Sequence, residues 1–298
     1  MKLNSLVFAT IAACATSQAA NLDTTSREYK GLLEPTLFTF QTEQANVKLF
    51  SQELAATISQ AIDRDVTGVA ALDKERTVTY WDASGSCELK RLDYSFRDRV
   101  NIYDITDRDA ALKVRKADRF VSGYEDLSSS ETDFETKMEE DLLINNKLEL
   151  VVKHSHSTKI NSYTENIGKF DDIYHHFPGF KAAYGTIDPE LALVAVGQVH
   201  FYERRYKGQI IDLGKFDADI VISLWYTSAT PQPEDTPVVA EVSFDYSDPE
   251  AQYTQKVVQR AAGAIFAIAG MTQWVNLNAQ TKTDFAYSYD PNFCTSAQ

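Results

Sequence analysis

The chain has 298 residues, a formal net charge of −14 and 44% hydrophobic residues, enough to bury a large core in one or two domains. This acidity argues against nucleic acid and anionic membranes as partners, because both would be repelled. After the N-terminus, the longest apolar candidate, residues 261–271, is shorter than the roughly 20 residues that a membrane-spanning helix needs.

The first 20 residues have the three parts of a secretory signal peptide. Lys2 supplies the positive charge, Leu6 to Ala13 form the apolar stretch, and small residues up to Ala20 suit a cleavage site. A short membrane anchor or an unstructured start is the alternative. We therefore expect a secreted, extracellular protein in which residues 21–298 form a single domain.

The cysteines agree with export. Cys14 lies within the expected signal peptide, which leaves Cys87 and Cys294, an even number that suits one disulfide in an oxidising compartment. Two unrelated free thiols are the alternative, although a buried thiol is hard to place in the polar tail around Cys294. We predict a Cys87–Cys294 disulfide that ties the tail to the first strands of the barrel.

Helical patterns occur in three segments. Residues 47–62 combine apolar positions at helical spacing with Gln, Glu and Ala. Residues 166–177 predict a short helix that stops before a Pro-Gly pair. A longer C-terminal helix is expected over about 249–272, since Asp248 can cap it and Pro249 suits its first position. The tail that follows is polar and predicts no further element.

Much of the remaining chain has a period of two, which predicts strands. The predicted strands are 77–81, 89–100, 111–116, 134–142, 148–160, 191–206, 210–213, 218–226 and 238–246. The polar segment 21–39 lacks clear periodicity. Charged residues recur on one face of successive strands, because alternate side chains share a face. That face is either the solvated outside of a sheet or the polar interior of a barrel.

Several familiar motifs are absent from the sequence. It contains no Gly-x-Ser-x-Gly elbow, P-loop, dinucleotide fingerprint or His-Glu-x-x-His pair. His154 and His156 have a workable metal spacing and His175 and His176 are adjacent, but no third ligand is identifiable. We expect these histidines to be surface or hydrogen-bonded residues, which leaves the charged strands as the candidate site.

The succession of charged strands resembles the CYTH-like, triphosphate tunnel superfamily. The similarity rests on segments 92–97 (Leu-Asp-Tyr-Ser-Phe-Arg), 112–116, 136–141, 201–206 and 239–245. It implies an α+β fold in which an antiparallel β-barrel, about residues 77–246, surrounds a charged tunnel and carries flanking helices. It also implies that active members bind or cleave tri- or polyphosphate with a divalent metal.

The resemblance assigns roles by position. It implies phosphate-binding residues Arg97, Lys113, Arg115, Lys137 and Arg204, and Mg or Mn ligands Asp93, Glu139 and Glu241. The family's N-terminal Glu-x-Glu-x-Lys strand finds its best counterpart in Asp93-x-Ser95-x-Arg97, with one acid lost. No catalytic residue is assigned.

Three functions stay open at this point. The protein either hydrolyses a phosphate-containing anion, binds such an anion outside the cell without hydrolysis, or uses the barrel as a scaffold for protein interactions. The retained bases favour the first two functions, and the lost acid favours the last two.

Overall fold

The computed structural model describes residues 23–295, so the predicted signal peptide and Cys14 lie outside the described residues. The long strands are β1 (Ser26–Leu33), β2 (Val66–Asp82), β3 (Tyr94–Asn101), β4 (Arg108–Lys116), β5 (Phe134–Ile144), β6 (Leu150–Ile160), β8 (Phe201–Asp212), β9 (Asp217–Tyr226) and β10 (Val239–Ser247). Two-residue strands β7 (Val194–Ala195) and β11 (Val275–Asn276) pair with β2 and β1. The helices are α1 (Glu43–Ile62), α2 (Glu88–Arg91), α3 (Arg119–Gly123), α4 (Phe170–His176), α5 (Pro178–Tyr184), α6 (Gln255–Ala269) and α7 (Lys282–Tyr289), with short 3-10 turns at Pro35–Leu37 and Val196–Gln198.

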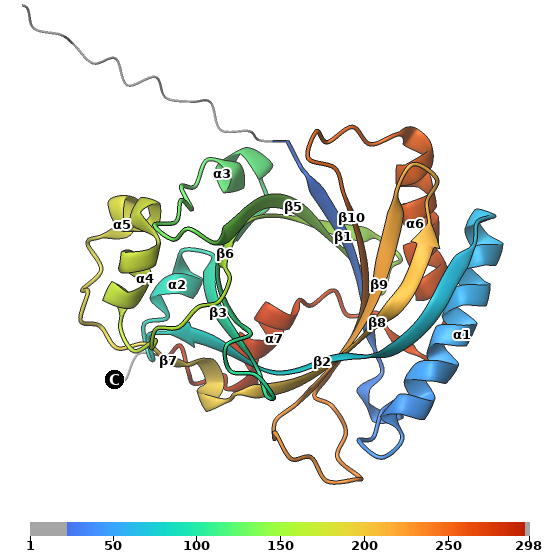
Figure 1. The fold of residues 1–298 in the computed structure, drawn as a ribbon, viewed down its shortest axis with the longest axis horizontal. Coiled ribbons are helices and arrows are strands. Elements are labelled where there is room, and N and C mark those ends of the chain that lie inside the picture. The colour runs from blue at the N-terminus through green and yellow to red at the C-terminus, as the bar shows by residue number, and fades with distance from the viewer. Residues whose placement is uncertain (1–22, 296–298) are drawn as a thin grey trace, which may run out of the picture.

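The nine long strands of the described chain form a closed ring (Figure 1). Their order is β10-β9-β8-β2-β3-β4-β6-β5-β1, and β1 pairs with β10 to complete the circle. Neighbouring strands are antiparallel except β1 and β5, which are parallel. The α+β fold expected from the resemblance, a largely antiparallel sheet closed on itself with flanking helices, is therefore confirmed.

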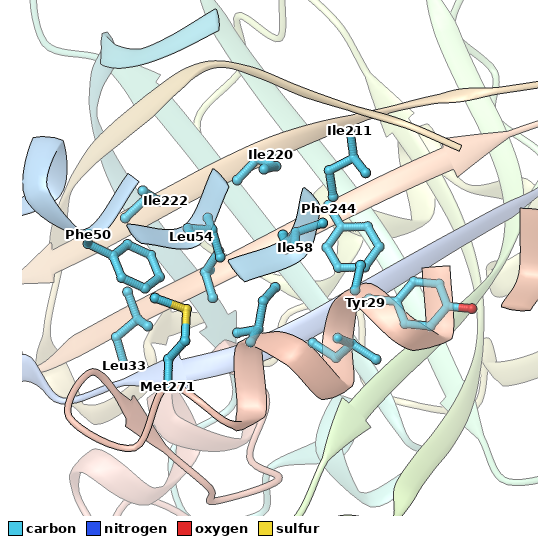
Figure 2. Packing of buried hydrophobic residues seen from close by; sticks show 14 of the residues in the cluster. Tyr29, Leu33, Phe50, Leu54, Ile58, Ile211, Ile220, Ile222, Phe244 and Met271 are labelled. Carbon is cyan, nitrogen blue, oxygen red and sulfur yellow. The ribbon is translucent and has the colours of Figure 1, made fainter. Parts of the chain in front are cut away.

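The largest hydrophobic core lies outside the ring rather than within it. Helices α1 and α6 cover the outer face of β1, β8, β9 and β10. Figure 2 shows Phe50, Leu54 and Ile58 of α1 packed with Ile220 and Phe244 of the sheet. Because side chains alternate across a strand, an apolar outer face leaves the charged residues of the same strands pointing inward.

A second core lies under α4 and α5, where Tyr94 and Phe96 of β3 pack with Phe177 and Phe180. The sequence predicted one helix here that stops before Pro178. The structure instead has two helices, because Pro178 occupies the first position of α5, where its missing N–H costs nothing.

The C-terminal third differs from expectation in two helices. The helix predicted over about 249–272 begins only at Gln255, where the Thr254 hydroxyl accepts a hydrogen bond from the Val257 N–H. Asp248 instead closes a turn by accepting a hydrogen bond from the Glu250 N–H at 3.0 Å. Helix α7 lies in the tail, where the sequence predicted no element.

Three strand boundaries were also wrong. The polar segment 21–39 contains β1, so the ring begins well before residue 77. Residues 89–100 divide into α2 and β3. The predicted strand 191–206 is broken by a 3-10 turn, and β8 continues through Gly208, where a shift in strand register replaces the expected turn.

Cys87 and Cys294 form a disulfide, with their Cα atoms 5.3 Å apart and a sequence separation of 207. The bridge attaches the tail beyond α7 to the segment that leads into α2, as the sequence predicted. Within residues 23–295, no helix combines the length and hydrophobicity that crossing a membrane requires.

Candidate functional site

The interior of the ring holds a cavity of about 300 Å³. Ten basic side chains line it: Lys30, Arg76, Arg97, Arg99, Lys113, Arg115, Lys137, Lys159, Arg205 and Lys282. Six acidic side chains accompany them: Glu28, Glu135, Glu139, Glu203, Glu241 and Asp245. The cavity is therefore rich in positive charge although the whole chain carries −14, which indicates a site for an anion.

Six of the eight predicted ligands line this cavity. They are Arg97, Lys113, Arg115, Lys137, Glu139 and Glu241. The strand register explains their convergence on β3 and β4, where Ser95 lies opposite Lys113 and Arg97 lies opposite Ala111. Residues opposite each other in a ladder share a face, so alternate positions of both strands point inward.

Arg204 does not point into the cavity. Its guanidinium pairs with Glu43 of α1 and with Glu75, whose Oε1 lies 2.5 Å from Nη1, on the outer side of the sheet. Its neighbours Glu203 and Arg205 line the cavity instead. Successive side chains of a strand point to opposite faces. The prediction for Arg204 was wrong because it placed this residue on the inward face of β8, which Glu203 and Arg205 occupy.

Asp93 also lies outside the cavity. It precedes β3 with a positive φ of 63°, and its side chain is 61% exposed and pairs with Lys116 at 2.7 Å. Asp93 precedes the first residue of β3, so the alternation that turns Ser95 and Arg97 inward does not extend to it. The expected metal ligand Asp93 is thus an exposed residue at the start of β3.

Strand β1 supplies the residues that the sequence analysis missed. Glu28 and Lys30 line the cavity, and Lys30 Nζ lies 2.5 Å from Asp141 Oδ1. The run Ser26-x-Glu28-x-Lys30 therefore fits the Glu-x-Glu-x-Lys spacing better than the segment at Asp93 does, with serine at the first acidic position. The available signal was the spacing itself, because Ser26, Glu28 and Lys30 lie at every second position.

Three carboxylates gather at one side of the cavity. Ligand oxygens of Glu28, Glu139 and Asp141 all lie within 4.8 Å of one another. Both oxygens of the buried Glu139 face lysines, with Lys113 Nζ 2.7 Å from Oε1 and Lys137 Nζ 2.5 Å from Oε2. The three carboxylates form an all-oxygen set of the kind that Mg²⁺ or Mn²⁺ prefers.

The same carboxylates are held in their ionised form. Burial would raise the pKa of Asp141, but the charges of Lys113, Lys30 and Arg115 outweigh it and hold that pKa well below its ordinary value. The pKa of Glu139 is lowered in the same way, with Lys113 again opposing the effect of burial. A metal ligand must be deprotonated, so both residues meet this requirement at neutral pH.

An arginine cluster lies elsewhere on the cavity wall and consists of Arg76, Arg97 and Arg99. Arg76 pairs with Glu203, and Arg99 Nη2 lies 2.8 Å from Asp109 Oδ1. Among the ten cavity bases, Arg97 alone forms no ion pair within the described part of the chain, and its Nε is buried without a hydrogen-bond partner. The cluster has one more base than its acids neutralise.

Burial and repulsion between neighbouring bases lower the pKa values of two cavity residues, Arg99 and Lys113. Burial, followed by the charges of Arg97 and Arg76, lowers the pKa of Arg99 to about 9. Burial and the charge of Arg115 lower the pKa of Lys113 to about 8, against the pull of its acidic neighbours. A bound anion would relieve this repulsion by favouring the charged forms.

Helix α7 contributes the remaining wall. Thr281, Lys282 and Thr283 line the cavity, and Lys282 Nζ lies 2.8 Å from Glu241 Oε1 and 3.8 Å from Glu203 Oε1. Glu241 is therefore paired with a lysine of the tail and does not join the three carboxylates.

The histidines take no part in the cavity. His176 is buried, with Nδ1 2.7 Å from Glu131 and Nε2 3.2 Å from Glu165. None of the four candidate histidines belongs to a metal-capable group of side chains in residues 23–295.

Comparison with known proteins identifies structural neighbours only. No protein-family model matches the chain, and comparison with curated proteins finds no significant match. The chain is similar to a candidate adenylyl cyclase from Hippeastrum described as having a dominant triphosphatase activity, at 12% identity and a TM-score of 0.44, over 89% of this chain and 96% of that chain. It is also similar to a candidate adenylate cyclase from Vibrio parahaemolyticus, at 10% identity and a TM-score of 0.34, over 88% and 97%. At this level of similarity, the ligand has to be inferred from the residues of the cavity.

Proposed function

We propose that the cavity binds an anion of linked phosphates, such as tri- or polyphosphate, together with Mg²⁺ or Mn²⁺, and hydrolyses it. The observation that carries this proposal is the arginine cluster, in which Arg97 is half-buried, forms no ion pair in the described chain and has a buried Nε without a hydrogen-bond partner. Partial burial of an unpaired cation is costly unless a ligand supplies the opposite charge.

The distribution of the bases favours a chain of phosphates over a single small anion. Arg97 and Arg99 lie on β3, Lys113 and Arg115 on β4, and Lys137 on β5, so positive groups follow the wall across three strands. Arginine binds phosphate oxygens in a bidentate manner, and lysine adds point charges. An extended anion with several charged groups can contact these bases at once.

Glu28, Glu139 and Asp141 would hold the metal. When bound, a divalent ion would neutralise charge on the phosphoryl oxygens and orient the attacking water. Lys113 lies between this acidic group and the wall of bases, with Nζ 2.7 Å from Glu139 Oε1 and 3.4 Å from Asp141 Oδ2. It is placed to stabilise charge that develops on a phosphoryl group beside the carboxylates.

One observation favours binding without hydrolysis as the second candidate. Ser26 stands where the Glu-x-Glu-x-Lys spacing would place another acid, so β1 offers the metal one carboxylate rather than two. The two candidates differ in turnover and agree on the ligand.

We also propose that the protein works outside the cell. The Cys87–Cys294 disulfide supports this location, because such bridges persist in oxidising compartments. N-terminal sequencing of the exported protein tests it: the mature chain should begin at Ala20 or Asn21, and a retained Met1 would contradict export by a cleaved signal.

The function is tested by calorimetric titration with tripolyphosphate and by phosphate release in Mg²⁺ or Mn²⁺. Glu139→Gln should lower phosphate release more than a hundredfold while metal-free binding of tripolyphosphate stays within a few-fold, because the change removes a metal ligand but no base. Glu140→Gln is the matched control, since Glu140 is the next residue of β5 and pairs with Arg27 outside the cavity. Binding without phosphate release from the unmodified protein would select the second candidate. Absence of tripolyphosphate binding would refute both.

A further inference from the structure

Helix α7 divides the interior of the ring. Its first residues, Lys282 and Thr283, line the charged cavity. A second, more open cavity of about 590 Å³ lies beyond it, lined by Asp284, Tyr287 and Ser288 of the same helix. Figure 1 shows α7 within the circle of strands.

The two cavities adjoin each other. Ser95, Arg115 and Thr283 line both of them, and Arg115 Nη1 donates a hydrogen bond to Thr283 Oγ1 at 2.8 Å. Thr283 therefore lies at the partition. Without α7, the charged cavity and the second cavity would be continuous.

Contacts with several parts of the barrel hold α7 in this position. Lys153 Nζ of β6 lies 2.8 Å from Asp284 Oδ2, and the Tyr287 hydroxyl donates a hydrogen bond to the buried Asp82 at 2.8 Å. Beyond the helix, the disulfide from Cys294 to Cys87 cross-links the tail to the barrel.

The opposite end of the charged cavity is more open. Glu135 and Lys159 line the cavity with side chains that are 60% and 33% exposed. Glu203 and Glu241, which Lys282 of α7 contacts, are 2% and 3% exposed. A ligand therefore has access from the side of Glu135 and meets α7 at the far end.

We propose that α7 makes this cavity blind, so that a phosphate chain enters only by one of its ends, and that the Cys87–Cys294 disulfide keeps α7 in place. The inference rests on the proposed function and adds a limit on how the ligand can enter the cavity. A linear chain has two ends, so it can hold at most two protein molecules, whatever its length. A channel open at both ends would let a long chain pass through and hold several molecules side by side.

The number of protein molecules bound per chain tests the inference. Unmodified, oxidised protein is mixed in excess with linear polyphosphate of two lengths in buffer without divalent metal, so that the chain is not hydrolysed, and the complexes are sized by sedimentation velocity. We expect two molecules per chain at both lengths. More than two, increasing with chain length, would overturn the blind cavity.

Two full-length variants test the role of the tail. Cys87→Ser/Cys294→Ser removes the bridge, and adding Ala286→Pro to it breaks α7 in its middle, because proline cannot donate the helical hydrogen bond. For both variants, more than two protein molecules should bind to the longer chain. The same is expected of unmodified protein reduced by a dithiol, which gives two electrons and two protons to the Cys87–Cys294 bridge, leaves two protein thiols and becomes a disulfide itself. If the bridge-free variant and the reduced protein keep two per chain while the proline variant does not, the disulfide is not what keeps α7 in place.

The outcomes separate this inference from the proposed function. Failure of the oxidised protein to bind tripolyphosphate refutes the proposed function and the inference with it. Tripolyphosphate binding combined with many molecules per long chain refutes the inference alone. The measurement on oxidised protein decides the blind cavity even if a variant fails to fold.

Discussion

Arg97 and Arg204 carry the same charged group in opposite surroundings. Arg97 faces the cavity without an ion pair in the described chain. Arg204 is 8% exposed and pairs with Glu43 and Glu75 beneath α1. The first arginine is available to a ligand, and the second neutralises a buried acid.

Substituting Arg97 by glutamine should therefore weaken ligand binding without destabilising the fold, and substituting Arg204 should destabilise the fold with little effect on binding. Arg97→Gln should weaken tripolyphosphate binding about tenfold or more, a loss of about 1.4 kcal/mol or more, and leave the melting temperature unchanged or higher. Arg204→Gln should lower the free energy of unfolding by up to about 3–5 kcal/mol, because it leaves Glu43 buried and uncompensated, with little effect on affinity. Calorimetry and thermal melting measure both quantities, and equal effects of the two variants on affinity would contradict the assigned faces.

Asp245 should make stability depend on pH. Burial, followed by the charge of Glu28, raises its pKa from 3.8 to about 6. Between these values the folded protein keeps a proton that the unfolded chain has lost, so this group's contribution to stability falls as pH rises. Asp245→Asn should raise the free energy of unfolding by on the order of 3 kcal/mol above pH 6 and change little near pH 4. A melting series of both proteins across this range checks the prediction, and a gain that is equal at both ends would contradict it.

At the scale of elements, period two was enough to find most of the strands, and six of the eight ligands that the resemblance implied line the cavity. It could not decide which face of β8 turns inward, because Glu203, Arg204 and Arg205 are all charged. The sequence analysis missed β1 because a charged inner face makes a strand look like a polar loop. It also missed α7. This helix has only eight residues and is held by contacts with distant strands, such as that of Tyr287 with Asp82.

The disulfide should contribute much of the free energy that holds the tail on the barrel. In the chain-entropy model, a bridge between residues 207 apart stabilises by at most about 5 kcal/mol. Cys87→Ser/Cys294→Ser should lower the urea midpoint by the equivalent of a few kcal/mol, with far-UV circular dichroism unchanged. A midpoint equal to that of the oxidised protein would show that the tail's contacts suffice without the bridge.

At the scale of the whole molecule, a basic cavity lies inside an acidic protein. With a net charge of −14, the molecule repels anions at long range, whereas the basic cavity attracts them at short range.

Salt should therefore change the rates of ligand binding in an unusual way. The screening length falls from about 30 Å at 0.01 M salt to about 10 Å at 0.1 M, so salt weakens the long-range repulsion first. Stopped-flow measurements with tripolyphosphate should show an association rate constant that rises over this range, and a dissociation rate constant that also rises. A steep fall in the association rate constant would mean that the field of the cavity dominates at long range.

The pairing of β1 with β10 has a consequence for how the chain folds. Ser26 lies opposite Ser247, so the ring is completed by two segments that lie far apart in the sequence. Such long-range contacts make folding slow, because the entropy of loop closure is paid before the contacts form. An open sheet normally risks aggregation while it waits, yet here the inner face that awaits closure carries the charged residues of the cavity. The side chains that suit an anion in the finished protein also keep that face soluble in the newly made chain.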